Sequence, residues 1–262
     1  MSDQAIYLQG LIAAEAALFS DARDVIGVYV DGEMDFRKLE PLRRAAKRRD
    51  LELVKESREA LNTRAGAENH GGVLAHVGER KFITAQELLA AAKAEQAGEP
   101  FVVMLDGVED PFNFGQALRS LYAAGCHGVV VRPRNWTAAG SAATVARASA
   151  GASELIPMML ADDPEAAAEI FNEAGLEVAA AAEVPDATPL NEAALAGPLF
   201  LLIGGEKRGV KRSFLDRCRL KVAIPYARPF DLSLGTVAAT SVLAFEVARQ
   251  RQESGKRSKG KK

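Results

Sequence analysis

Three segments of the chain share one local plan, in which a short apolar run leads through a glycine- or proline-containing loop into a helix. The apolar runs cover residues 101–105, 199–203 and 222–224. Runs of this length, bounded by such loops, are typical of buried strands. In open α/β sheets, polar groups just beyond the carboxyl ends of the strands line ligand sites. We therefore expect an α/β protein whose binding residues lie in these three loops.

The alternation of strands and helices extends over most of the sequence. In the C-terminal part we expect strands near 101–105, 128–132, 155–158, 177–182, 199–203 and 220–224, and helices near 114–125, 140–147, 164–175, 211–217 and 235–252. In the N-terminal part we expect strands over 25–30, 51–55 and 73–77, and helices over 10–19, within 37–49, over 57–61 and from Thr84 to near Ala97. The pattern predicts a parallel sheet with helices on both faces, preceded by a smaller α/β unit and a polar linker over 93–100.

The first of the three junctions carries polar groups suited to a binding cleft. Asp110-Pro111 makes a turn, Asn113 and Gly115 follow at the mouth of a helix, and Arg119 lies in its first exposed turn. We expect the loop to hold Asn113 while the helix directs Arg119 toward the same cleft. The alternative is a capped helix start with an ordinary surface arginine.

The second junction has Gly204-Gly205 directly after its strand, with Glu206 just beyond. The glycines let the backbone approach a ligand closely. A phosphate-binding P-loop is excluded, because Val210 occupies the position where that motif requires lysine. No G-x-G-x-x-G follows any expected strand, which disfavours a dinucleotide-binding fold.

The third junction ends its strand at Ile224-Pro225, and the run Ser233-Leu234-Gly235-Thr236 then opens a helix of small residues. Taken alone, this segment would be interpreted as an ordinary alanine-rich core helix. Its position after a third strand end connects it with the other two junctions.

Together the three motifs resemble the SpoU (TrmH) group of SPOUT RNA methyltransferases, and the resemblance covers most of the chain. The matching residues are Asn113, Gly115 and Arg119 in the first motif, Gly204, Glu206 and Gly209 in the second, and Ile224, Pro225, Ser233 and Leu234 in the third. The stretch 148–157 also resembles the family segment that links the first two motifs. One departure is Gly235, which stands where the family has asparagine, so that Ser233 and Thr236 become candidate substitutes for its hydrogen bonds.

The resemblance implies a particular architecture. Residues 96–253 would form the catalytic parallel-sheet domain with a deep trefoil knot, after a ribosomal-protein-like RNA substrate-binding domain over 1–95 and before a disordered basic tail over 254–262. It implies a homodimer formed through the knot region, and S-adenosyl-L-methionine bound within the knot. The cofactor-binding residues carried over are Gly204, Gly205, Ile224, Pro225, Leu234 and Thr236.

The resemblance also implies methyl transfer to a ribose 2′-hydroxyl of ribosomal or transfer RNA, with Arg119, Asn113, Glu206 and Ser233 as catalytic residues. Because arginine stays protonated in proteins, Arg119 is better suited to clamp a phosphate or stabilise the developing alkoxide than to act as a base. Two alternatives stay open. One is a base methyltransferase of the same fold, with Asp231 near the third motif as proton acceptor; the other is a non-catalytic RNA-binding or ribosome-assembly protein, suggested by Gly235.

The formal net charge is −2, whereas nucleic-acid-binding proteins often carry a basic excess. Basic residues are nevertheless clustered: segment 37–49 holds seven against one acidic residue, and segment 253–262 holds five. We expect RNA contacts from Arg43, Arg44, Lys47, Arg48 and His70. The alternatives are a solvated helix face, a solubilising tail and, for His70, a loop-capping role.

Composition places the chain among soluble globular proteins, with 48% hydrophobic and 26% charged residues. No apolar run approaches the roughly 18 residues of a membrane span, and the N-terminus does not resemble a signal peptide. The two cysteines, Cys126 and Cys218, suit a reducing cytosol, so we expect a cytoplasmic protein. The three histidines lack metal-ligand spacing, and no metal is expected.

Overall fold

The computed structural model describes residues 5–94, 98–133, 139–205 and 209–259. Contacts divide the chain into two compact units. As far as they are described, the first unit comprises Met1–Lys81, Asp110–Arg119 and Arg134–Leu155, and the second comprises Phe82–Glu109, Ser120–Pro133 and Ile156–Lys262.

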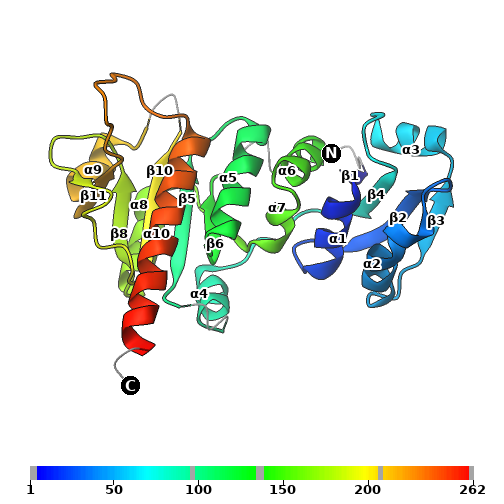
Figure 1. Ribbon diagram of the computed structural model, residues 1–262, viewed down its shortest axis with the longest axis horizontal. Helices are drawn as coiled ribbons and strands as arrows, with labels where there is room; N and C mark the ends of the chain where they lie inside the picture. The colour runs from blue at the N-terminus through cyan, green and yellow to red at the C-terminus, as the bar shows by residue number, and fades with distance from the viewer. Residues whose placement is uncertain (1–4, 95–97, 134–138, 206–208, 260–262) are drawn as a thin grey trace. The chain divides into compact units, whose positions relative to one another are not determined.

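The first unit is built on a four-stranded sheet with the strand order β1-β4-β2-β3. Its central strand β4 pairs antiparallel with β1 and β2, and β2 pairs parallel with β3. The strands are β1 (Ile6–Gln9), β2 (Val25–Asp31), β3 (Leu53–Glu56) and β4 (Val73–Val77). The helices of this unit are α1 (Leu11–Phe19), α2 (Phe36–Lys47), α3 (Arg58–Ala65), α6 (Ala139–Ala148) and α7 (Ala152–Leu155). Figure 1 shows these elements coloured from blue to green.

One face of this sheet is covered by α1, α2 and α6, because all of them bring apolar side chains to a common core. On α2 the buried positions Leu39, Leu42 and Ala46 recur at helical spacing, so the helix buries one stripe and leaves its basic residues exposed. Ala142 and Ala146 of α6 belong to the same core. A segment far along the chain therefore completes the N-terminal unit.

The second unit contains a seven-stranded sheet with the order β7-β6-β5-β10-β8-β11-β9, and every pairing in it is parallel. The strands are β5 (Phe101–Asp106), β6 (Gly128–Val131), β7 (Met158–Leu160), β8 (Glu177–Ala181), β9 (Thr188–Pro189), β10 (Leu199–Gly204) and β11 (Leu220–Ala223). The helices are α4 (Ala85–Ala94), α8 (Pro164–Glu173), α9 (Arg212–Arg217) and α10 (Thr236–Lys259). The expectation of a parallel α/β sheet is thereby confirmed.

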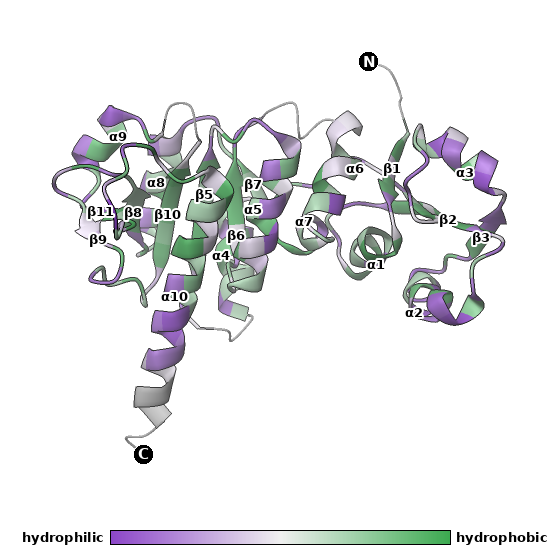
Figure 2. Cartoon of the chain, turned by 45° about the horizontal axis from the view of Figure 1, so that its top comes forward, coloured by the Kyte–Doolittle hydropathy of each residue, from purple (hydrophilic) through white to green (hydrophobic). Residues whose placement is uncertain are grey.

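Helices cover both faces of this sheet, as Figure 1 shows. The even-numbered residues of β5 and β10, such as Met104 and Leu202, pack against α4, α8 and α9. On the other face lies α10, whose Arg251 stacks its guanidinium over Phe101, 5.3 Å from the ring centroid. Figure 2 shows that α10 is hydrophobic in its first half and hydrophilic in its second. The buried apolar residues Leu243, Ala244 and Val247 all lie in the first half.

Several details differ from the expectations. The strand expected over 155–158 is wrong: α7 occupies Ala152–Leu155, and the strand β7 begins after Pro157, at Met158. Residues 254–259, expected to be disordered, continue α10 as a helix. The short strands β1 and β9 were not expected. A capping box precedes α4, since the Thr84 amide donates to Glu87 at 2.7 Å and the Glu87 amide to the Thr84 hydroxyl at 3.2 Å.

Candidate functional site

A pocket of about 320 Å³ lies at the carboxyl edge of the second sheet, within the second unit. The ends of β8, β10 and β11 and the first turns of α10 form its walls, so it occupies the position where parallel sheets bind ligands. Its lining consists of Ala181, Ala182, Glu183, Val184, Ile203, Gly204, Gly205, Gly209, Val210, Leu215, Val222, Ala223, Ile224, Tyr226, Ser233, Leu234, Thr236, Ala239 and Leu243.

Glycine is required at one wall of the pocket because backbone packs directly on backbone. A Cβ atom on Gly204 would lie 2.3 Å from the carbonyl carbon of Gly209, and one on Gly205 would lie 2.1 Å from the carbonyl oxygen of Gly107. The Gly205 amide also donates to the carbonyl of Asp106 at 2.6 Å. No side chain fits in these places, so this wall presents main-chain atoms.

The loop after β11 is closed by a tyrosine. The hydroxyl of Tyr226 accepts a hydrogen bond from the backbone amide of Leu234 at 3.0 Å. The centroids of the Tyr226 and Phe230 rings are 6.1 Å apart. The α10 helix then begins, with the Gly235 carbonyl accepting from the Ala239 amide at 3.0 Å. Tyr226 and Leu234 both line the pocket, so this hydrogen bond holds the two ends of the loop at the pocket wall.

Most of the residues expected to bind a cofactor lie together in this pocket. Gly204, Gly205, Ile224, Leu234 and Thr236 all line it, and Ser233, expected to be catalytic, lies beside them. Pro225 is exposed and is not among the lining residues. Glu206 lies outside the described residues. Asp231, the proton acceptor of the alternative base-methylating mechanism, is exposed and does not line the pocket.

The wall contributed by β8 was not expected from the sequence. Ala181, Ala182, Glu183 and Val184 line the pocket at the end of this strand. The signal was available, because β8 was expected as a strand of the same parallel sheet and its carboxyl end had to open on the same edge. What the sequence did not reveal is that β8 lies directly beside β10.

Asn113 and Arg119 lie on α5 (Pro111–Ala123), which begins earlier than expected. Asp110 caps it: its carboxylate accepts from the Asn113 amide at 2.7 Å, and proline takes the first helical position. Asn113 is therefore in the first helical turn rather than in a loop. Six positions apart on a helix, Asn113 and Arg119 point about 120° apart around its axis. Arg119 is exposed.

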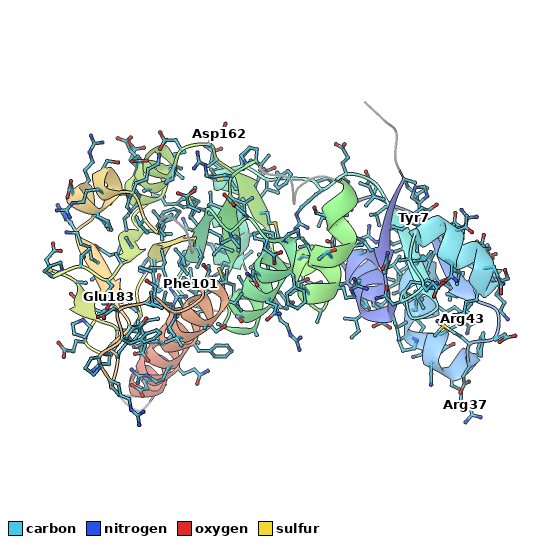
Figure 3. The ribbon with its side chains drawn as sticks, turned by 90° about the horizontal axis from the view of Figure 1, so that it is seen from above. Tyr7, Arg37, Arg43, Phe101, Asp162 and Glu183 are labelled. Atoms are coloured by element: carbon cyan, nitrogen blue, oxygen red, sulfur yellow. The ribbon has the colours of Figure 1, made fainter. Side chains whose placement is uncertain are left out.

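Cations expected to contact RNA are exposed on α2. Arg43 and Arg44 both pair with Glu40, at 3.0 and 2.9 Å, while Lys47 and Arg48, the residue that caps the end of α2, are also exposed. Figure 3 shows Arg37 and Arg43 projecting from this helix.

His70 is different, because only 1% of its surface is exposed. Its Nδ1 accepts from the Gly72 amide at 3.1 Å and its Nε2 lies 2.7 Å from Asn62 Oδ1. Burial, followed by the charge of Arg58, lowers the pKa of His70, which keeps the ring neutral. This arrangement corresponds to the loop-capping role, and it leaves no ring nitrogen for an RNA contact.

Within the described ranges, no group of three or more histidine, cysteine, aspartate or glutamate side chains is arranged to hold a metal ion. In the same part of the chain, no helix has the length and apolar character needed to cross a membrane.

The fold and the pocket define a class of protein, an α/β protein with a parallel sheet and a glycine-walled pocket at the carboxyl edge of that sheet. Solved RNA methyltransferases share the fold. The structure of an AdoMet-bound rRNA methyltransferase from Sinorhizobium meliloti matches with a TM-score of 0.73 at 22% identity, over 94% of this chain and 87% of that one. The SpoU methyltransferase AviRb from Streptomyces viridochromogenes, in complex with AdoMet, matches with a TM-score of 0.72 at 22% identity, over 95% and 91%. At this identity the likeness establishes the fold.

Sequence comparison establishes the family. The profile of the SpoU rRNA Methylase family matches residues 100–245. The 23S rRNA (guanosine-2'-O-)-methyltransferase RlmB of Pectobacterium atrosepticum is 33% identical over 93% of this chain and 98% of its own length. The RlmB of Yersinia pestis is 32% identical over 93% and 97%. The chain belongs to the SpoU rRNA methylase family, which confirms the resemblance inferred from the three motifs.

Proposed function

We propose that this protein transfers the methyl group of S-adenosyl-L-methionine to a ribose 2′-hydroxyl of ribosomal RNA. The observation that carries the proposal is the pocket at the carboxyl edge of the second sheet, where five of the six residues expected to bind the cofactor lie together. Relatives named as 23S rRNA guanosine-2′-O-methyltransferases, similar over 93% of the chain, support the ribose target and ribosomal RNA.

The residues of the pocket fit this cofactor. Its volume of about 320 Å³ lies at the small end of the roughly 300–1,000 Å³ range of ligand sites. Ile203, Val222 and Leu243 supply apolar walls for an adenine ring. Gly204 and Gly205 present backbone groups, and the carboxylate of Glu183 gives a negative charge next to a ligand that carries a positive sulfonium.

The bound cofactor supplies an electrophilic methyl group, and the protein supplies position and charge. A protonated Arg119 would stabilise the oxyanion that forms as the ribose hydroxyl loses its proton, a role that an arginine performs without any change in its own charge. Asn113, Glu206 and Ser233 complete the proposed catalytic set by holding the ribose and the loops in register. Positioning both substrates in one pocket would supply a large part of the rate.

We further infer a trefoil knot in residues 96–253, following a substrate-binding domain over 1–95. Strand β10 lies between β5 and β8, although β8 precedes it in the chain. After β11 the chain returns to the β10 loop, so that Gly204, Ile224 and Leu234 come from three passes of the chain through one pocket. Such crowding of successive segments supports the knot.

A homodimer formed through the knot region is supported by apolar side chains that α10 and the preceding loop expose. Phe230, Leu232, Val242 and Phe245 are 53%, 66%, 42% and 52% exposed. Val242 and Phe245 are three positions apart on α10 and therefore share one face of the helix, and exposed apolar groups that lie together mark interaction surfaces. A cytoplasmic location agrees with the two unpaired, buried cysteines.

The experiment is calorimetric titration with S-adenosyl-L-methionine, combined with transfer of labelled methyl to 23S rRNA from a strain that lacks the enzyme. Wild type should bind the cofactor and yield a 2′-O-methylated nucleoside. The variant Ala239→Trp, which fills the pocket, should lose binding. Arg119→Ala should bind normally but transfer about 10²–10³ times more slowly, the usual effect of removing an oxyanion-stabilising donor.

Three results would contradict the proposal. If a folded wild-type protein bound no cofactor with RNA present, the pocket would have another role. If the product carried its methyl group on the base, the protein would be a base methyltransferase, and the proposal of ribose methylation would be wrong. Normal transfer by Arg119→Ala would remove this residue from the catalytic set.

A further inference from the structure

The face of the N-terminal sheet that points away from the core carries a row of aromatic side chains. The register of the strands places Tyr7 of β1 opposite His76 of β4, and His76 opposite Gly27 of β2. Gly27 has no side chain, and the ring of Tyr29 occupies the adjacent space, with its hydroxyl 3.4 Å from where a Cβ of Gly27 would lie. The rings therefore extend across three neighbouring strands.

The rings contact one another in defined geometries. Tyr7 stacks on His76 with ring centroids 5.0 Å apart and an interplanar angle of 29°. Tyr7 meets Tyr29 edge to face, with centroids 6.3 Å apart. Arg64, from the last turn of α3, places its guanidinium 4.2 Å from the centroid of the Tyr29 ring. We call Tyr7, Tyr29, His76 and Arg64 the aromatic platform.

The platform is held in place by the helix beside it. Arg64 donates to both carboxylate oxygens of Glu56, at 2.6 and 2.7 Å, and to the Tyr7 hydroxyl at 3.4 Å. Arg58, at the other end of α3, pairs with Asp31 at 3.1 Å. A guanidinium fixed by a bidentate pair holds a stacking surface in one orientation, which lowers the entropy lost when a ligand binds.

In these two ion pairs the arginine side chains are more exposed than the carboxylates, which favours an anionic ligand. The side chains of Arg58 and Arg64 are 54% and 35% exposed, whereas their partners Asp31 and Glu56 are only 9% and 16% exposed. The rim of the platform thus presents cations to solvent and keeps the carboxylates beneath. The three rings are half-buried, and Val54, opposite Tyr29 on β3, is 45% exposed.

His76 contributes a flat neutral ring. Burial, followed by the charge of Arg64, lowers its pKa, so the imidazole is uncharged at neutral pH. Neutral aromatic rings beside a guanidinium are the groups on which unpaired bases of single-stranded nucleic acid stack, with the phosphates held by cations.

We propose that the aromatic platform binds unpaired bases of the RNA substrate by stacking. This inference rests on the proposed function only in taking RNA as the ligand. The cations of α2 lie on the helix that covers the opposite face of the same sheet, so the platform would contact a different part of the RNA from the one they contact. Flipped or looped nucleotides are the class of target that such a surface recognises.

The test uses the full-length protein and measures binding of a labelled 12-nucleotide oligouridine and of an RNA duplex of equal length. Tyr7→Ala and Tyr29→Ala should each weaken oligouridine binding by about 5- to 150-fold, the usual effect of losing one stacked base. Tyr7→Phe, which keeps the ring, should bind like wild type. Duplex binding should change little in all three variants, because paired bases offer no free face.

A second variant separates loss of stacking from loss of folding. Val54→Glu adds a negative charge to an exposed position beside Tyr29, and it should weaken oligouridine binding without lowering the melting temperature. Photo-cross-linking with 5-iodouridine RNA should label Tyr7, Tyr29 or His76. Normal oligouridine binding by both alanine variants, or cross-links confined to other residues, would contradict the proposal that the aromatic platform binds RNA bases.

The outcome is distinguishable from failure of the proposed function. If the protein bound oligouridine through the platform but transferred no methyl group, the platform would stand and the enzymatic proposal would fail. If methyl transfer to 23S rRNA were normal in Tyr7→Ala and Tyr29→Ala with unchanged RNA affinity, the enzymatic proposal would stand and the platform would fail.

Discussion

Gly115, in the first of the three family motifs, lies where the structure leaves no space for a side chain. A Cβ atom there would lie 2.7 Å from both the Cβ of Ala148 and the carbonyl oxygen of Val145, because α5 and α6 touch through their backbones. We predict that Gly115→Ala destabilises the protein by about 1–3 kcal/mol, the usual cost of overpacking, despite the better helix propensity of alanine. Urea unfolding followed by circular dichroism measures the change.

The matched control for this prediction is Gly140, which also lies in a helix but has nothing within 4 Å of its ideal Cβ. Gly140→Ala should stabilise the protein by about 0.4–1 kcal/mol, because it reduces the entropy of the unfolded chain alone. Equal effects of the two substitutions would show that space around Gly115 is not the limiting factor.

The cysteines give a second prediction at the scale of residues. Burial raises the pKa of the Cys126 thiol to about 12, and burial also raises that of Cys218. A raised pKa favours the protonated thiol in both residues, and only the thiolate reacts with disulfide reagents. The native protein should therefore react slowly with Ellman's reagent at pH 8, and denaturant should release two fast thiols. A fast thiol in the native protein would contradict the burial.

At the scale of elements, a buried ion network joins α7 to the segments that precede β2 and follow β4. Glu154, 2% exposed, lies 3.1 Å from Arg23 and 3.4 Å from Arg80. Burial lowers the pKa of Arg80 to about 10, so it stays charged at neutral pH. We predict that Glu154→Ala costs about 3–5 kcal/mol, because it leaves two buried cations without their carboxylate. Thermal and urea unfolding measure the loss.

Replacing the whole network provides the control for Glu154. The triple variant Arg23→Met/Arg80→Met/Glu154→Leu removes every charge at once and should recover most of the lost stability, since apolar packing can substitute for a buried ion network. If the triple variant were as unstable as Glu154→Ala, the shape of these side chains rather than their charge would hold α7 in place.

An element could be predicted well when the residues that define it lie within or next to it in the sequence. Strand β4 was expected over the residues where it lies, and the helix expected from Thr84 begins at Ala85 as α4. Strand β7 was placed too early, because the apolar run around Pro157 does not reveal where the short helix α7 ends. Strand β9 has only two residues, too few for a sequence pattern. Strand β1 has four, and its pairing with β4, which is distant in the sequence, defines it.

For the molecule as a whole, the pocket was predicted in its outline but not in full. The glycines and the Ser233–Thr236 run were identifiable because strand ends and helix starts leave local signals. Glu183 and Val184 were missed, because only the order of strands in the sheet brings β8 beside β10. The Tyr226 hydrogen bond to Leu234 was missed for the same reason, since loop closure depends on three-dimensional contacts.

The exposed apolar residues of α10 allow the proposed homodimer to be tested. Phe245 is 52% exposed in the hydrophobic first half of this helix, which covers one face of the second sheet. We predict that Phe245→Glu converts the proposed homodimer into a monomer, because a charge placed in the proposed apolar interface would lose its water without gaining a partner. Light scattering coupled to size-exclusion chromatography measures the mass, at protein concentrations from 1 to 50 μM.

The control for this prediction lies on the other face of the same sheet. Ile170 of α8 is 42% exposed, so Ile170→Glu adds the same charge in place of a similarly exposed apolar side chain. This variant should remain a dimer. If both variants stayed dimeric, the interface would lie elsewhere, and if both became monomeric, added charge alone would explain the effect. Loss of the dimer in Phe245→Glu alone would assign the interface to the first half of α10, next to the segment 226–234, whose two ends line the pocket.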